Sequence, residues 1–196
     1  MPRPPFSASA LLAFVLLLLV APLSPALALD DKAAAPLKAG GHVILMRHEK
    51  TVAGVADPPG FRLGDCSTQR NLSDAGREDA RRFGEDLRKS GIAVDRVLSS
   101  PWCRCIDTAK LTFPEKEPEP DASLSSFVEI RGTDDRNDAL EKMRATIAAW
   151  KGSGNLLMVS HGVTITALAG GSLPQGGLLV LKPKPGGFDI VATDRR

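Results

Sequence analysis

The chain has 196 residues, 43% of them hydrophobic, with 25 lysines and arginines against 23 aspartates and glutamates. This length suits one domain with its own core, and the apolar content is too high for a disordered chain. The nearly balanced charge lacks the clustered lysines and arginines of a nucleic-acid-binding face, so we expect no nucleic-acid partner.

The first 28 residues are predicted to be a signal peptide. Arg3 supplies a basic start, Ala10–Val20 form an apolar stretch, and Ala26–Ala28 match the small-residue pattern at which signal peptides are cleaved. A membrane-spanning helix needs about 20 apolar residues, more than this stretch offers, so an uncleaved signal anchor is the weaker alternative. We expect an exported protein, periplasmic or secreted, with no stable membrane insertion after cleavage. Residues 29–40 are predicted to be a flexible leader, and residues 41–196 one folded domain.

The first part of this domain is predicted to be a strand, a long loop and a helix. His42–Met46 is a short apolar run with β-branched residues, which indicates a buried strand. The loop from Thr51 to Asn71 is rich in Gly, Pro and Asp and is longer than most connections, which is typical of a binding loop. Ser73 is placed to cap a helix that carries apolar residues at helical spacing and ends at Gly91.

The middle of the chain repeats this alternation. Val94–Leu98 is predicted to be the second strand, and Pro101–Leu111 is predicted to be a helix with proline near its start. The acidic, proline-rich stretch Phe113–Pro120 is expected to be a surface connection. Ser123–Ile130 is the candidate third strand.

The last part adds a helix, a strand and a hairpin. A helix beginning at Asp134 or Asp135 carries apolar residues on one face as far as Trp150, and Asn155–Ser160 follows as a buried strand. The segments 178–181 and 188–191 are predicted to pair as an edge hairpin. Alternating strands and helices predict an α/β fold with three α/β/α layers and a mostly parallel central sheet.

Three cysteines in an exported chain favour one disulfide and one free thiol. Cys103 and Cys105 are too close in sequence to bridge comfortably, so we expect Cys66 to pair with one of them. Three reduced, buried cysteines are the alternative.

Chemically versatile residues follow the predicted strands. In such sheets, ligands bind beyond the carboxyl ends of the strands. Arg47, His48 and Glu49 follow the first strand, and Arg104 lies at the start of the helix after the second. Glu129 ends the third candidate strand, and His161 follows the fourth. Two histidines and two arginines are thus expected at one rim.

This combination suits phosphoryl transfer. Two guanidinium groups can hold phosphate oxygens by charge-assisted hydrogen bonds worth roughly 1.5–3 kcal/mol each. A neutral imidazole can attack phosphorus, and a second imidazole can stabilise the transition state when it is protonated. A carboxylic acid must protonate the leaving oxygen and then activate water. No metal or other cofactor is expected, because arginine and histidine can neutralise the charge.

Four motifs in the same order and spacing resemble the histidine phosphatase superfamily, which has the phosphoglycerate-mutase-like fold. They are LMRHEKT, NLSDAG, VLSSPWCRCIDTA and VSHG, and the resemblance runs from about Gly41 to Leu181. The chain is similar to the short, capless branch-1 members, which include small exported phosphatases and phosphohistidine phosphatases. The resemblance implies a metal-independent phosphoric monoester hydrolase that acts on a small phosphorylated substrate or a phosphoprotein.

The resemblance also assigns roles to individual residues. His48 would accept the phosphoryl group, Arg47 and Arg104 would bind it, and His161 would be the second histidine of the pocket. Glu129 is the preferred general acid, with Asp134 and Glu49 as competitors. Arg70 and Thr51 are candidate substrate-binding residues, whereas His42 is expected to be structural.

Glu49 stands where the family usually has glycine or alanine. A carboxylate beside the phosphate would repel it unless the side chain points away or bonds a neighbour. This residue supports an alternative function, a phosphate- or sugar-phosphate-binding protein with weak or no catalysis. A metallohydrolase using His42, His48 and His161 is a third, weaker interpretation, because His42 lies at the wrong end of its strand.

Overall fold

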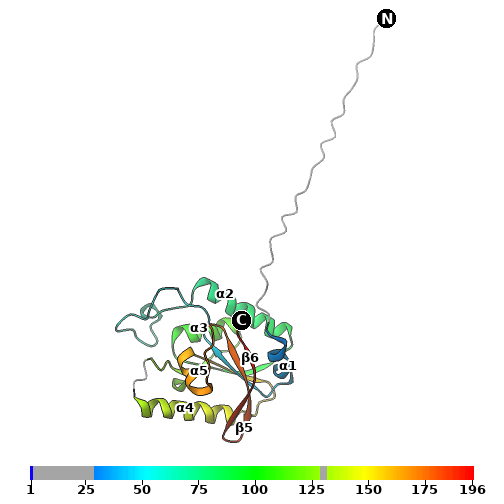
Figure 1. The fold of residues 1–196 in the computed structure, drawn as a ribbon. Coiled ribbons are helices and arrows are strands. Elements are labelled where there is room, and N and C mark those ends of the chain that lie inside the picture. Colours follow the sequence, from blue (N-terminus) through cyan, green and yellow to red (C-terminus); the bar gives the residue numbers. More distant parts are fainter. Residues whose placement is uncertain (2–28, 129–131) are drawn as a thin grey trace.

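The computed structural model describes all residues except 2–28 and 129–131. The predicted signal peptide and Glu129 therefore lie outside the described residues. Six strands form one sheet in the order β3-β2-β4-β1-β5-β6 (Figure 1). None of the helices in the described part of the chain is long and apolar enough to cross a membrane.

Four strands are parallel, and a hairpin extends the sheet antiparallel to them. The parallel strands are β1 (Val43–Arg47), β2 (Val94–Ser99), β3 (Glu119–Pro120) and β4 (Asn155–Ser160). The hairpin strands are β5 (Leu178–Lys184), which pairs with β1, and β6 (Gly187–Asp194), which forms one edge. The mostly parallel sheet and the edge hairpin are confirmed.

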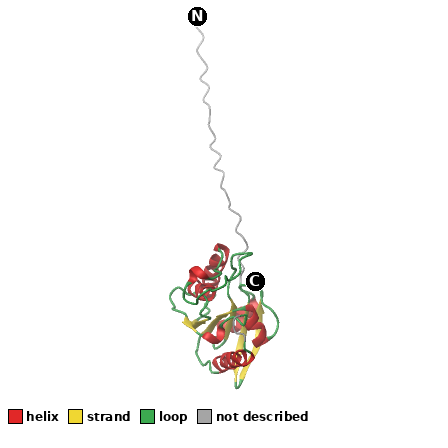
Figure 2. Ribbon diagram, turned by 90° about the vertical axis from the view of Figure 1, so that its left-hand side faces the viewer, coloured by secondary structure: helices red, strands yellow, loops and turns green. Residues whose placement is uncertain are grey.

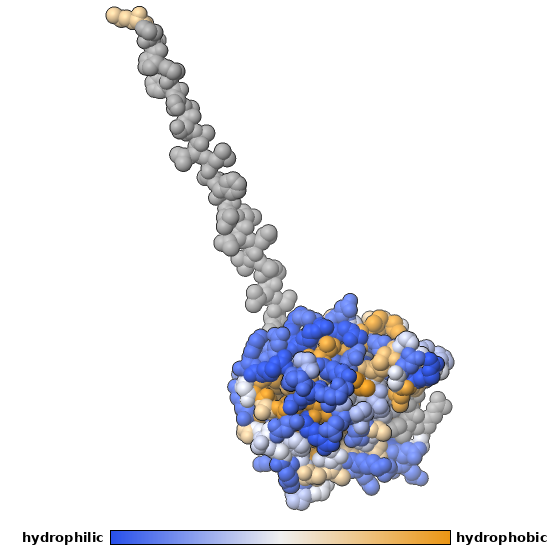
Figure 3. All heavy atoms as spheres, turned by 180° about the vertical axis from the view of Figure 1, so that it is seen from behind, coloured by the Kyte–Doolittle hydropathy of each residue, from blue (hydrophilic) through white to orange (hydrophobic). Residues whose placement is uncertain are grey.

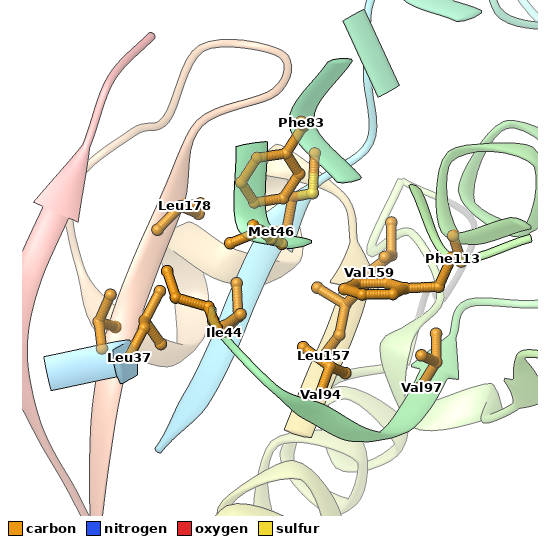
Figure 4. Close-up of a cluster of buried hydrophobic side chains, with 14 of the residues drawn as sticks. Leu37, Ile44, Met46, Phe83, Val94, Val97, Phe113, Leu157, Val159 and Leu178 are labelled. Atoms are coloured by element: carbon orange, nitrogen blue, oxygen red, sulfur yellow. The ribbon is translucent and has the colours of Figure 1, made fainter. Parts of the chain in front are cut away.

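Helices cover both faces of this sheet (Figure 2). The helices are α1 (Asp31–Ala39), α2 (Asp74–Lys89), α3 (Cys103–Thr112), α4 (Thr133–Ala148) and α5 (Gly162–Ala169). Alternate side chains of β1 point to opposite faces, as in any strand. Ile44 and Met46 pack with Phe83 of α2 and Leu37 of α1 (Figure 4), whereas Val43 and Leu45 belong to the core under α4 and α5. The predicted three-layer α/β/α architecture is confirmed.

The flexible leader predicted for residues 29–40 is wrong. Asp30 caps helix α1 by accepting a hydrogen bond from the Lys32 amide (2.9 Å), and Ala33 and Leu37 are fully buried. The Asn155 side chain also binds the carbonyl oxygen of Leu37 (2.8 Å). The small apolar side chains of this helix fit closely over the sheet, so packing stabilises a segment whose composition is typical of a linker.

The third strand was predicted in the wrong place. Residues 122–124 form a short 3-10 helix, and the strand beside β2 is the two-residue β3, inside the predicted surface connection. The carbonyl oxygens of Leu124 and Ser125 accept hydrogen bonds from the Ser160 and Thr164 side chains (2.7 Å each), so this segment binds side chains of β4 and α5. Leu124 and Phe127 are buried because they fill the core, which explains the apolar pattern.

The face of the molecule that is turned away from the viewer in Figure 1 is mostly hydrophilic, with hydrophobic residues in small groups (Figure 3). Such a mixture is normal for a globular domain, in which isolated apolar side chains reach the surface. The carboxyl ends of β1, β2 and β4, in contrast, bring together the predicted reactive side chains.

Candidate active site

His48 and His161 lie side by side because the strands that precede them are parallel neighbours. Arg47 at the end of β1 is in register with Ser160 at the end of β4, so the next residue of each strand emerges at the same rim. The two imidazole rings are 5.5 Å apart between centroids, edge to face, and both residues are buried. The predicted convergence of the two histidines at one rim is present in the fold.

His48 is held in the form that a nucleophile needs. Its Nδ1 lies 2.8 Å from the Glu49 carbonyl oxygen, which can only accept, so Nδ1 carries the proton. Burial first, and then the positive charges of Arg104, Arg47 and Arg70, lower the pKa of His48 to about 3, although the bond to Glu49 opposes this. The ring is therefore neutral, and its Nε2 carries the lone pair.

His161 occupies the N-cap position of α5. Its Nε2 lies 2.8 Å from the Ser100 hydroxyl, and Nη2 of Arg104 lies 3.5 Å from its Nδ1. Burial, and then the neighbouring His48 and Arg104, hold the pKa of His161 well below its usual range. Approach of a phosphate would oppose these positive charges and favour protonation of this ring.

Arg104 is buried in the first turn of α3. Its Nη1 binds both carboxylate oxygens of Asp57, at 3.1 and 3.2 Å, and its guanidinium group stacks 4.4 Å from the ring centroid of Trp102. These contacts hold the planar group in one orientation. Asp57 and Trp102 had no signal in the sequence, because a loop aspartate and a buried tryptophan are common without any function.

Arg47, Arg70 and Arg104 each have a buried Nε–H without a hydrogen-bond partner among the described residues. Buried polar groups are nearly always paired, and three such donors around one rim are typical of an anion-binding site. Arg47 is anchored through its Nη1, which donates to the Leu173 carbonyl oxygen (2.6 Å). The absent side chain of Gly162 leaves room for it, since a Cβ there would lie 3.1 Å from the guanidinium carbon.

A cavity of about 440 Å³ opens over the two histidines. Its lining residues include Arg47, His48, Arg70 and His161. A neighbouring cavity of about 250 Å³ is lined by Asp57, Arg70 and Arg104, among others, and shares Arg70 with the first. Arg70, a candidate substrate-binding residue from the sequence, thus lines both cavities.

The other candidates differ in position. Thr51 lines neither cavity, and its hydroxyl accepts a hydrogen bond from the Gln175 side chain (3.0 Å), so it braces the loop. Asp134 lies exposed in the first turn of α4 and lines neither cavity. His42 binds the Gly40 carbonyl oxygen through Nδ1 (2.7 Å) at the opposite end of β1, which fits the structural role expected for it. The described residues contain no group of three or more His, Cys, Asp and Glu side chains arranged to hold a metal ion.

A disulfide fastens the long loop to α3. Cys66 is bonded to Cys103, which confirms the predicted disulfide and selects between the two candidate partners. The Cys103 amide also donates to the Gln69 side chain (3.0 Å). The loop that carries Asp57 and Arg70 is therefore tied to the helix that carries Arg104. Cys105 stays free and buried, and burial raises the pKa of its thiol to about 12, so the thiol is neutral.

Glu49 points away from the histidines. Its carboxylate lies against Gly176 in a separate small cavity that is also lined by Arg196 and Asp79. The repulsion expected for a carboxylate beside the phosphate therefore does not arise at this position. Burial raises the pKa of Glu49 to about 7, opposed by the charge of Arg196 and reinforced by that of Asp79.

Glu49→Gln is expected to remove a pH dependence of stability. Because the folded pKa is raised from 4.5 to about 7, Glu49 costs stability progressively as the pH rises through this interval. The wild type should lose about 3 kcal/mol of unfolding free energy relative to the variant between pH 4 and pH 8, at 1.36 kcal/mol per pKa unit. Urea unfolding at both pH values measures this change. Glu141→Gln, at an exposed site of α4, is the control, and the same pH trend in both variants would contradict the assignment.

Part of the chain matches a known protein family. Residues 43–130 match the family model of the histidine phosphatase superfamily (branch 1). The mitochondrial serine/threonine-protein phosphatase Pgam5 of Drosophila grimshawi is 31% identical over 78 residues, which are 40% of this chain and 24% of that protein. The chain thus matches about a quarter of the length of this curated relative.

Solved structures share the fold at low identity. A putative alpha-ribazole-5'-P phosphatase from Escherichia coli matches with a TM-score of 0.59 and 18% identity, covering 79% of this chain and 96% of that chain. A mycobacterial glucosyl-3-phosphoglycerate phosphatase matches with a TM-score of 0.59 and 16% identity, covering 79% and 99%. Residues 43–130, less than half of the chain, thus match the histidine phosphatase superfamily (branch 1), and both solved phosphatases share the α/β fold of this chain.

Proposed function

We propose that this protein is a phosphatase that hydrolyses phosphomonoesters through a covalent phosphohistidine on His48, without a metal ion. The observation that carries the proposal is the neutral imidazole of His48, on which the charges of three arginines act, each with a buried Nε–H that has no partner among the described residues. A lone pair next to donors for the phosphate oxygens meets the two requirements of nucleophilic phosphoryl transfer.

The first step forms the phosphoenzyme. Nε2 of His48 attacks phosphorus while Arg47, Arg70, Arg104 and His161 bind the non-bridging oxygens. The P–O bond to the leaving group breaks, and the leaving oxygen takes a proton from a carboxylic acid. The resemblance to the family assigns this acid to Glu129. Asp57 is a weaker candidate because both of its oxygens bind Arg104.

The second step releases phosphate. The same carboxylate takes a proton from water, whose oxygen attacks phosphorus, and the P–N bond breaks to restore neutral His48. The bond from Nδ1–H to the Glu49 carbonyl strengthens as positive charge develops on the ring, which favours the intermediate. The arginines keep their contacts to phosphate in both steps.

A rapid-quench experiment with p-nitrophenyl phosphate tests the covalent step. We expect a burst of p-nitrophenol close to the enzyme concentration and protein-bound phosphate that is acid-labile and base-stable, because a P–N bond has these properties. Hydrolysis should persist in EDTA. Steady hydrolysis without any trapped phosphoenzyme under single-turnover conditions would contradict the mechanism.

A binding protein without catalysis is the alternative function. Its support in the sequence was Glu49, and this carboxylate lies in the small cavity beside Gly176, away from the histidines. The geometry thus gives no reason to expect impaired chemistry. Tight binding of inorganic phosphate with no hydrolysis of any phosphomonoester would favour the alternative.

The substrate is proposed to be a small phosphorylated molecule or a phosphoprotein. Relatives of both kinds occur, since the Drosophila protein is named a serine/threonine-protein phosphatase and the Escherichia coli protein an alpha-ribazole-5'-P phosphatase. We propose no nucleic-acid partner, in accordance with the balanced charge of the chain.

We also propose that the protein is exported, to the periplasm or to the medium, after cleavage of residues 1–28. The Cys66–Cys103 disulfide supports this location, because disulfides persist in oxidising compartments. N-terminal sequencing of the protein from its native cells should find a start soon after Ala28. Protein that begins at Met1 would contradict the proposal.

A further inference from the structure

The large cavity over His48 is lined by two chemically different kinds of side chain. Arg47, Arg70 and the two histidines line it together with the aliphatic side chains of Val128, Val163 and Leu173. The remaining polar side chains are the small hydroxyl groups of Ser126, Thr166 and Ser172. The described lining residues include no aspartate or glutamate.

Two of the valines that line this cavity are exposed. Val128 is 64% exposed and Val163 is 46% exposed, although both lie beside a site built for a charged group. Val163 follows Gly162 in the first turn of α5, so the helix that places His161 also places this valine. Exposed apolar groups beside a polar reactive centre are typical of a ligand-binding wall.

A second cavity of about 400 Å³ adjoins the first and shares Val128 and Val163 with it. Its other apolar lining residues are Phe127, Leu140 and Ala167, and its polar lining residues are Thr133, Arg136 and Asn137 of α4. Apolar side chains therefore line both cavities where they meet, between α4 and α5.

We propose that this wall binds the leaving group and that the preferred substrates are phosphomonoesters of apolar alcohols. The proposal rests on the phosphatase function proposed above and adds the class of substrate. An apolar chain would remove the exposed Val128 and Val163 from water, whereas the hydroxyl groups of a sugar would lose hydration there and gain few partners. The phosphate of the same substrate would bind beside the arginines.

Alkyl phosphates of different length test this preference. Ethyl and hexyl phosphate have leaving groups of similar basicity, so a difference in kcat/KM reports binding of the chain. Each fully buried CH₂ adds about fourfold at 0.8 kcal/mol, so partial burial of four should make hexyl phosphate at least about tenfold better. A phosphate ester of the same length with ether oxygens in the chain should lose most of this gain.

The matched variants are Val163→Thr and Val191→Thr. Threonine keeps the size of valine but replaces one methyl group with a hydroxyl group, and Val191 is a similarly exposed valine on β6 that does not line the cavity. We expect the hexyl-to-ethyl ratio of kcat/KM to fall at least about threefold in Val163→Thr and to stay unchanged in Val191→Thr.

Two outcomes separate this inference from the proposed function. Hydrolysis of ethyl phosphate with no gain for hexyl phosphate, or an equal gain for the ether analogue, would overturn the inference and leave the phosphatase function intact. Ethyl- and hexylphosphonate are not hydrolysed, so calorimetry with both compounds measures how much the longer alkyl chain adds to the binding affinity without turnover. Tighter binding of hexylphosphonate with no hydrolysis of either ester would contradict the proposed function and support the apolar wall.

Discussion

Replacing His48 with asparagine is expected to abolish hydrolysis of every phosphomonoester, by a factor of at least about 10³ in kcat. The asparagine amide can still donate to the Glu49 carbonyl oxygen, as Nδ1 of His48 does at 2.8 Å, so the backbone after β1 keeps its hydrogen bond. The variant lacks any lone pair in the position of Nε2, and no phosphoenzyme can form. Steady-state kinetics and the rapid-quench experiment measure both effects.

The control for this variant is His42→Asn. The chain has three histidines, and His42 lies at the other end of β1 with a comparable Nδ1 bond to the Gly40 carbonyl oxygen. This variant should keep its turnover within about twofold. His48→Asn should also keep its affinity for inorganic phosphate, because the arginines remain. Hydrolysis by His48→Asn near the wild-type rate would overturn the proposed role of His48.

Arg104→Ala is expected to lower kcat/KM by about 10²–10³-fold, the equivalent of one or two charge-assisted hydrogen bonds. The buried guanidinium group is held by Asp57 and stacked on Trp102, so its remaining donors are oriented before substrate arrives. Its loss also leaves the carboxylate of Asp57 without its partner beside the phosphate site, which adds repulsion. Kinetics with p-nitrophenyl phosphate measure the loss.

A second substitution separates these two causes. Asp57→Asn in the Arg104→Ala background removes the negative charge and should recover part of the activity, because only the repulsion is relieved. Arg96→Ala is the control, since Arg96 forms an exposed ion pair with Glu119 at the edge of the sheet. Equal activity of Arg104→Ala and Arg96→Ala would contradict a role for Arg104 in binding phosphate.

Local patterns in the sequence predicted most of the fold. Strands β1, β2 and β4 were found as short apolar runs, and Ser73 was identified as the cap of α2, whose Gly76 amide it binds (3.1 Å). The local sequence patterns gave wrong predictions for two segments whose structure depends on packing against the rest of the fold. Helix α1 resembles a linker in composition, and the apolar residues Leu124 and Phe127 fill the core instead of forming a strand.

The sequence by itself was enough to predict the candidate reactive residues and the rim at which they meet. His48 and His161 follow apolar runs, and the carboxyl ends of neighbouring parallel strands meet at one edge of a sheet. Charge and composition could not reveal this site, because a few placed cations are enough to bind one phosphate. The spacing of the motifs carried that information.

Only the tertiary structure decided what surrounds these residues. It placed the Glu49 carboxylate in another cavity, chose Cys103 as the partner of Cys66 and brought Asp57 to Arg104 across 47 positions of sequence. It also buried the rings of His48 and His161, which keeps them neutral. Side-chain direction, desolvation and long-range pairing depend on what surrounds a residue in space, and the residue's neighbours in sequence do not specify that environment.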